Sequence, residues 1–159
     1  MQAARPGQVH VGWRGFSLAQ VNHPEPNRWR VWEQPLRDPA WQLADCASSL
    51  RAFWAAEAAR RQDEALFLQM HRLLLQARHG LGQDLADLDH LTHLAREAGL
   101  ELQRFRRDMA DPTCLERLAG DHEAGRVQGV FGTPTFVFPG SQPVYLKLGR
   151  LLSPDEGVR

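Results

Sequence analysis

Two cysteines are the side chains of this sequence best suited to redox chemistry. Cys46 and Cys114 lie 68 positions apart, so they form neither a CxxC pair nor a zinc-ligand spacing. Asp111 followed by Pro112 predicts a helix start, which places Cys114 where the helix dipole favours a thiolate. A reactive thiol also needs exposure and a reaction partner, and the sequence signals neither. We therefore interpret both cysteines as small packing residues and free thiols.

Histidine spacing suggests a metal site only weakly. His90 and His93 are three positions apart in a predicted helix, with Asp87 one turn earlier, so two ligands would share one face. Leucines of an apolar stripe alternate with these residues, and no third and fourth ligand is signalled. We interpret the three as a solvated helix face and predict no metal and no cofactor. The remaining histidines that fall within predicted helices are isolated: His71, His79 and His122.

The run "GVFGTPTFVFPG", residues 129–140, is the most apolar stretch of the chain and has a proline at the start of a strand. Proline cannot donate to a strand ladder, so it belongs at the first residue of a strand or on an edge strand. The run predicts a β-hairpin, with "TFVF" and "VYLKL" as strands joined by "PGSQP". Thr133 and Pro134 stand at its entrance.

Composition excludes several classes of function. The 159 residues have equal numbers of acidic and basic side chains and a pI near 7.1, which argues against nucleic acid and anionic membranes as partners. No apolar run reaches the length of a signal peptide core or a membrane span, so we predict a cytoplasmic protein. In that reducing compartment a Cys46–Cys114 disulfide is not expected.

The elements expected around these residues follow from apolar periodicity. Residues 8–18 alternate as a strand, with Gly15 at a change of parity that suggests a bend. Residues 20–42, with four prolines and three tryptophans, form a long irregular connection that the aromatic rings tie to the rest. Residues 43–128 show four or five helical stripes, one of which ends at Gly99 in the left-handed conformation.

Five segments in order resemble one known family. They are "WRGFSLAQVN" at 13–22, "WEQP" at 32–35, "LRAFWAAEAARRQ" at 50–62, "DLDHLTHLAREAGLELQRF" at 87–105 and "GVFGTPTFVFP" from 129. Over roughly residues 9–148 the chain resembles the DsbA family of thioredoxin-like proteins, in the branch of FrnE-type dithiol-disulfide isomerases. The resemblance implies an α/β fold: an incomplete thioredoxin-like core with a large all-helical insertion between the N-terminal strand and the C-terminal hairpin.

The resemblance also implies a domain organisation and a site. Residues 1–159 form a single domain, in which 8–18 and 129–150 belong to the thioredoxin core and 43–128 form the insertion. Pro134 matches a family proline that follows a cis peptide bond. Thr133, before it, offers its backbone to an extended substrate. The implied partner is a thiol or disulfide protein or peptide.

One part of the family pattern has no counterpart. The family's first strand and its CxxC helix precede the strand that matches 8–18, and "MQAARPGQ" is too short to supply them. We therefore expect no catalytic dithiol in this chain and unpaired inner edges in its sheet. Three explanations remain open: a start inside a longer reading frame, which we favour, loss of that limb, or a strand supplied by another chain. A homodimer that covers the strand edges is a further expectation.

The resemblance leads to two hypotheses for the function, and a third possibility lies within the same superfamily. The first is thiol–disulfide oxidoreductase or isomerase ancestry, inactive without the CxxC. The alternative is a non-catalytic thioredoxin-like module that binds a peptide or protein. Related hydroxychromene carboxylate isomerases use serine in place of the first cysteine and act with glutathione, but "WEQP" and "FSLAQVN" resemble the FrnE-type branch instead.

Overall fold

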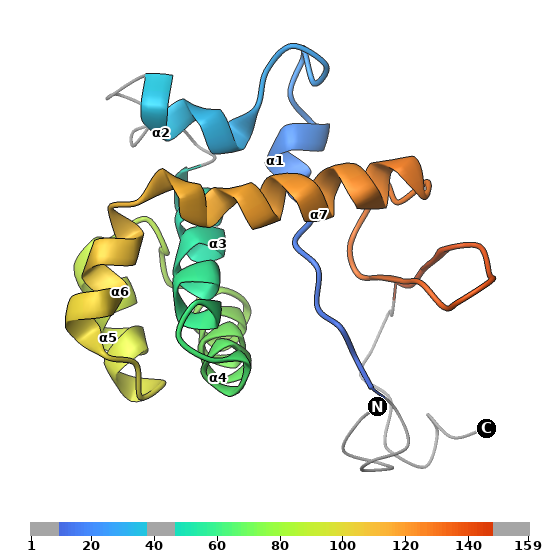
Figure 1. Cartoon of the computed structure of the whole chain (residues 1–159). Coiled ribbons are helices and arrows are strands. Elements are labelled where there is room, and N and C mark those ends of the chain that lie inside the picture. Colours follow the sequence, from blue (N-terminus) through green and yellow to red (C-terminus); the bar gives the residue numbers. More distant parts are fainter. Residues whose placement is uncertain (1–9, 38–46, 148–159) are drawn as a thin grey trace.

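The computed structural model describes residues 10–37 and 47–147 and shows a mainly helical chain with one small sheet (Figure 1). Three short elements come first: α1 (Leu18–Val21), the 3-10 turn η1 (Val31–Glu33) and α2 (Gln34–Arg37). The helical block follows, with α3 (Ala47–Arg60), α4 (Glu64–Leu75), the π-helical turn η3 (Gln76–Gly80), α5 (Leu88–Glu97), α6 (Leu102–Met109), the 3-10 turn η4 (Pro112–Leu115) and α7 (Glu116–Val127). Strands β1 (Thr135–Phe136) and β2 (Val144–Tyr145) end the described chain.

The hydrophobic core lies around α3, which packs against α4, α5, α6, η4 and α7. Its alanines Ala55, Ala58 and Ala59 are fully buried, and their small side chains let the neighbouring helices approach closely. Larger side chains fill the space between them: Leu50, Met70, Leu91, Phe105, Leu115 and Leu118. Burial of each such group stabilises the fold by about 1.5–3 kcal/mol. The helical block predicted for 43–128 is thus confirmed over the described residues from 47.

Acidic side chains begin most of these helices. Asp63, Asp87, Glu101 and Asp111 each accept a hydrogen bond from a backbone amide of the first turn. Such caps satisfy amides that have no partner within the helix. The predicted helix start at Asp111 is confirmed, although its first turn is 3-10. Gly99 has a φ of +82°, which confirms the predicted left-handed helix end. No described helix combines the length and apolar composition that crossing a bilayer requires.

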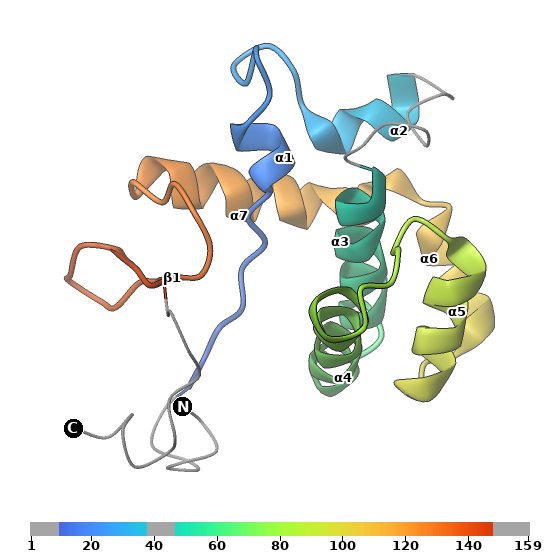
Figure 2. The same ribbon diagram turned by 180° about the vertical axis from the view of Figure 1, so that it is seen from behind.

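The strand predicted for residues 8–18 is wrong over the residues that the structure describes. Residues 10–17 pair with no described strand, and Leu18 begins α1. Two of the amides instead find side-chain acceptors on α7: Gly15 donates to Asp121 and Ser17 to His122, each at 3.2 Å. Alternating apolar residues predict an extended chain, but an extended chain becomes a β-strand only where a second strand lies beside it. In both Figure 1 and Figure 2 the segment runs between the helical block and the hairpin.

Gly15 has a different role from the predicted bend. A Cβ added there would lie 2.8 Å from Cδ1 of the buried Leu118 on α7. The glycine therefore allows the N-terminal segment to contact α7 directly.

Over its described residues, 20–37, the connection is less irregular than predicted, because η1 and α2 form within it. The side chain of Gln20 is buried and holds the first half of the connection in place through three hydrogen bonds. Its amide nitrogen donates to the carbonyls of Pro26 (2.9 Å) and Trp29 (2.7 Å), and its oxygen accepts the amide of Val31 at 2.9 Å. Trp29 and Trp32 pack against the hydrophobic core, which confirms for these two rings that they tie the connection to the helical block. The third tryptophan, Trp41, lies outside the described residues.

The predicted hairpin is present, but its strands are shorter than expected. In the antiparallel pair, Thr135 lies opposite Tyr145 and Phe136 opposite Val144. Large apolar side chains on and beside these strands are exposed: Val137, Phe138, Val144, Tyr145 and Leu146. The hairpin thus projects from the end of α7 (Figure 2) with little core of its own.

Candidate functional site

The C-terminus of α7 sets the direction of the loop that carries Thr133 and Pro134. Gly129, with a φ of +84°, donates to the carbonyl of Arg126 at 3.0 Å, and Val130 donates to that of Gly125 at 2.9 Å. This pair of bonds is a Schellman motif, in which glycine takes the left-handed conformation at low cost. The chain therefore leaves the helix at one defined angle.

Thr133 and Pro134 lie exposed between that motif and the hairpin, and the peptide bond between them is cis. The carbonyl of Pro134 accepts a hydrogen bond from the amide of Leu146 at 3.1 Å, which joins the loop to the second strand. The hydroxyl of Thr135 donates to the carbonyl of Gly132 at 2.6 Å. Among the described residues, no backbone group bonds to the N–H or C=O of Thr133.

An aromatic pair packs beside the loop that carries Thr133 and Pro134. The rings of Phe131 and Tyr145 are 5.2 Å apart and tilted by 51°. Gly132 is buried against Tyr145, and a Cβ added there would lie 3.1 Å from the ring. A larger residue at this position would displace Tyr145, so the close contact helps to hold Thr133 in place.

Cys114 is a free thiol that is not part of this site. It lies in η4, at the opposite end of α7 from the hairpin (Figure 1), and is 2% exposed. Burial raises the pKa of Cys114 to about 12, outweighing the opposite effect of Arg61. The interpretation as a packing residue is confirmed, and the helix dipole does not make this thiol reactive. Cys46 lies outside the described residues.

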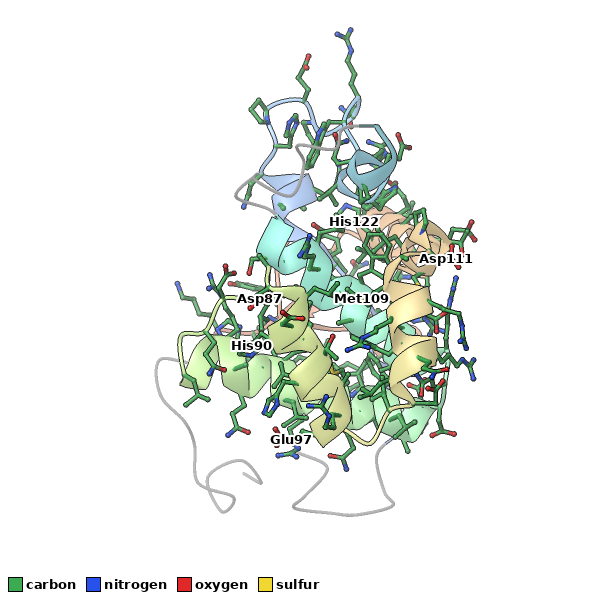
Figure 3. All side chains as sticks on the ribbon, turned by 90° about the vertical axis from the view of Figure 1, so that its left-hand side faces the viewer. Asp87, His90, Glu97, Met109, Asp111 and His122 are labelled. Atoms are coloured by element: carbon green, nitrogen blue, oxygen red, sulfur yellow. The ribbon has the colours of Figure 1, made fainter. Side chains whose placement is uncertain are left out.

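The histidines on α5 do not form a cluster with other potential metal ligands. Asp87 caps the helix, His93 is exposed, and His90 is half-buried. Figure 3 shows Asp87 and His90 along α5, well away from His122. In residues 10–37 and 47–147 no three side chains of the metal-binding types come close enough to share an ion.

Sequence analysis missed Asp121 and interpreted His122 only as an isolated histidine, but both are buried and hold the N-terminal segment. Asp121 accepts the Gly15 amide and also forms an ion pair with Arg14 at 2.7 Å. The ring of His122 stacks on Phe16, with centroids 4.5 Å apart. Their spacing contained a signal: they follow Leu118 by three and four positions, which places them on its buried helix face.

A second group of charges surrounds Glu57, which is buried on α3. Its carboxylate lies 3.2 Å from Arg60 and 3.7 Å from Arg117. Burial raises the pKa of Glu57, and the two arginines act in the opposite direction. These residues join α3 to α7 and thus support the helix that positions the loop.

Comparison with known proteins identifies the family. The model of the DSBA-like thioredoxin domain matches residues 1–149. The chain is 40% identical over 132 residues to a protein named Na(+)/H(+) antiporter NhaA 3 from Salinispora tropica, covering 83% of this chain and 16% of that protein. It is also 40% identical over 87 residues to Na(+)/H(+) antiporter NhaA 1 of Salinispora arenicola, covering 54% and 13%. The chain thus spans less than a fifth of the length of these relatives. On the match to residues 1–149, the chain belongs to the family of DSBA-like thioredoxin domains.

Proposed function

We propose that this domain binds an extended polypeptide at Thr133 and Pro134. The observation that carries the proposal is the backbone of Thr133: the residue is exposed, and its N–H and C=O have no backbone partner among the described residues. A free donor and acceptor on one residue at the end of a hairpin is what a strand of another chain pairs with. Membership of the DSBA-like family supports a peptide with thiols or a disulfide as the natural ligand.

We also propose that these 159 residues bind but do not perform thiol–disulfide exchange. Exchange begins with attack by a thiolate, and the thiol of Cys114 is buried and has a pKa of about 12. Cys46 and Cys114 are too far apart in sequence to form a CxxC pair. Exchange at this site would therefore need a dithiol from outside these residues. A cytoplasmic location, which we propose for the domain, agrees with the free thiol of Cys114.

The two relatives are much longer than this chain, and their names describe the whole proteins. We propose that the shared part is a DSBA-like domain within them and that sodium–proton antiport belongs to the remainder. The fraction of each relative that is matched, 16% and 13%, supports this division.

Binding is tested by titrating the isotope-labelled domain with a short extended peptide of valines and threonines and recording amide NMR spectra. We expect the largest shifts at Thr133 and its neighbours, because new hydrogen bonds form there. Thr133→Trp should weaken binding about tenfold, because its larger side chain obstructs the approach of the peptide to the backbone of this residue. Gln142→Trp, at the exposed tip of the hairpin, is the matched control and should bind normally.

The absence of exchange is tested separately by the reduction of insulin with dithiothreitol. We expect no acceleration over the uncatalysed reaction. Turnover by the wild-type chain that is lost in Cys46→Ser or Cys114→Ser would contradict the binding-only proposal. Shifts confined to the helical block in the NMR titration would contradict the binding site itself.

A further inference from the structure

A cavity of about 200 Å³ lies beside the Thr133 loop. Three segments form it: the N-terminal part of the chain, up to η1, contributes Phe16, Val21 and Arg30, α7 contributes His122 and Arg126, and the loop contributes Phe131. Phe131 is only two residues before Thr133, so their Cα atoms are at most about 7 Å apart. A peptide bound at Thr133 therefore passes within a side chain's reach of this cavity.

The charged groups around the cavity leave one positive charge in excess. Arg126 pairs with Glu123 at 2.9 Å, and Arg30 lies 3.9 Å from the same carboxylate. Hydrogen bonding to Arg126 lowers the pKa of Glu123, so this carboxylate is ionised at neutral pH. Two guanidinium groups thus face one carboxylate. The cavity favours an anion at its rim and apolar groups against Phe16 and Val21.

His122 adds a buried donor to this cavity. Its side chain is 2% exposed, and Nδ1 accepts the amide of Ser17 at 3.2 Å. Burial lowers the pKa of His122, so the neutral ring carries its proton on the other nitrogen, Nε2. The structure shows no hydrogen bond from that N–H to a described residue, and Nε2 is not among the side-chain atoms that are sealed from solvent without a partner. His122, labelled in Figure 3, lies on α7 and lines the cavity.

We propose that this cavity is a subsite for one acidic side chain of the peptide that binds at Thr133. The inference rests on the proposed function and specifies its ligand: an extended peptide with an aspartate or glutamate close to the paired segment. The carboxylate lies between the guanidinium of Arg126 and the Nε2–H of His122, and the methylene groups pack against Phe16 and Phe131. Hydrogen bonds that involve charged groups are stronger than those between neutral groups. A peptide with an aspartate or glutamate at this position should therefore bind more tightly than one with asparagine or glutamine.

The test compares two fluorescein-labelled peptides of valines and threonines that differ only in one central residue, glutamate or glutamine. Binding to the whole domain is followed by fluorescence anisotropy. We expect the glutamate peptide to bind about tenfold more tightly, which corresponds to about 1.4 kcal/mol. Arg126→Gln should remove this preference. Glu123→Gln should increase the preference, because it removes the competing carboxylate.

Arg107→Gln is the matched control, since Arg107 is an exposed arginine on α6, away from the cavity. It should keep the wild-type preference. Equal affinity for both peptides, with Thr133 shifts still present in NMR spectra, would overturn the subsite and leave the proposed function standing. A preference that survives Arg126→Gln would likewise overturn it. Failure of both peptides to bind would contradict the proposed function and the subsite together.

Discussion

The backbone amide of Ser17 donates a hydrogen bond of 3.2 Å to Nδ1 of His122, which lies 105 positions later in the chain. The adjacent residue of α7, Asp121, accepts the amide of Gly15 in the same way. Two consecutive side chains of one helix thus hold the N-terminal segment in place where no described strand pairs with it. The stability of this contact depends on the protonation of His122, because a protonated imidazole has no acceptor nitrogen.

We expect the domain to lose stability as the pH falls below about 6.5, and His122 to contribute to the loss. Burial lowers the pKa of His122 in the folded chain, so the unfolded chain binds this proton at a higher pH. The free energy of unfolding then decreases with falling pH by at most about 1.4 kcal/mol per pH unit for one proton. The burial of His71 also lowers its pKa and acts in the same direction. Urea unfolding between about pH 7.5 and 5.5 measures the slope.

Two substitutions of His122 distinguish the effect of its titration on stability from the effect of its hydrogen bond to the Ser17 amide. His122→Gln and His122→Phe both remove the titrating group, so both should reduce the pH slope relative to wild type. Only glutamine keeps an acceptor for the Ser17 amide, so the phenylalanine variant should be less stable at neutral pH by about 1–3 kcal/mol. Identical slopes in all three proteins would show that His122 does not cause the pH dependence.

Gly15→Ala should destabilise the domain because the added Cβ would lie 2.8 Å from Cδ1 of Leu118. Leu118 is 1% exposed and has little space into which it can move. We expect a loss of about 1–3 kcal/mol in the free energy of unfolding, typical of overpacking. Gly12→Ala is the control, since nothing lies within 4 Å of an added Cβ there. Equal stabilities would mean that the N-terminal segment is not held against α7.

Gln20→Leu should destabilise the connection between α1 and α2. The substitution preserves the approximate size but removes the partners of the Val31 amide and of the Pro26 and Trp29 carbonyls. Buried backbone groups left without partners cost about 1–3 kcal/mol each, and we expect a total near 2–4 kcal/mol because some regain water. Thermal unfolding followed by tryptophan fluorescence reports the change. Gln103→Leu, at an exposed position of α6, should have little effect.

Cys114 should resist alkylation in the folded domain. Its thiol is buried, and desolvation raises its pKa to about 12, so the thiolate is scarce at neutral pH. In a Cys46→Ser variant, iodoacetamide should leave the native protein unmodified by mass and label it fully in guanidinium chloride. Rapid labelling of the native variant would show that η4 opens readily or that the thiol is accessible.

Much of the helical architecture could be predicted without the structure. Apolar residues at spacings of three and four determine which faces of α3, α4 and α5 are buried, and such patterns depend only on local helix geometry. The helix start at Asp111 and the left-handed end at Gly99 follow from the chemistry of single residues. The order of the motifs, with "GTPTF" last, was sufficient for the family.

The sequence by itself thus determined the helices, the helix start at Asp111, the helix end at Gly99 and the position of Thr133 and Pro134, because these depend on neighbours a few residues away. Only the tertiary structure decided that residues 10–17 pair with side chains of α7, since a strand exists only where another strand lies beside it. It also decided that the position of Cys114 near a helix N-terminus does not make the thiol reactive, because desolvation by the packed core outweighs neighbouring charge. The cavity beside Thr133 required all three of its segments to meet, a contact that no single stretch of sequence contains.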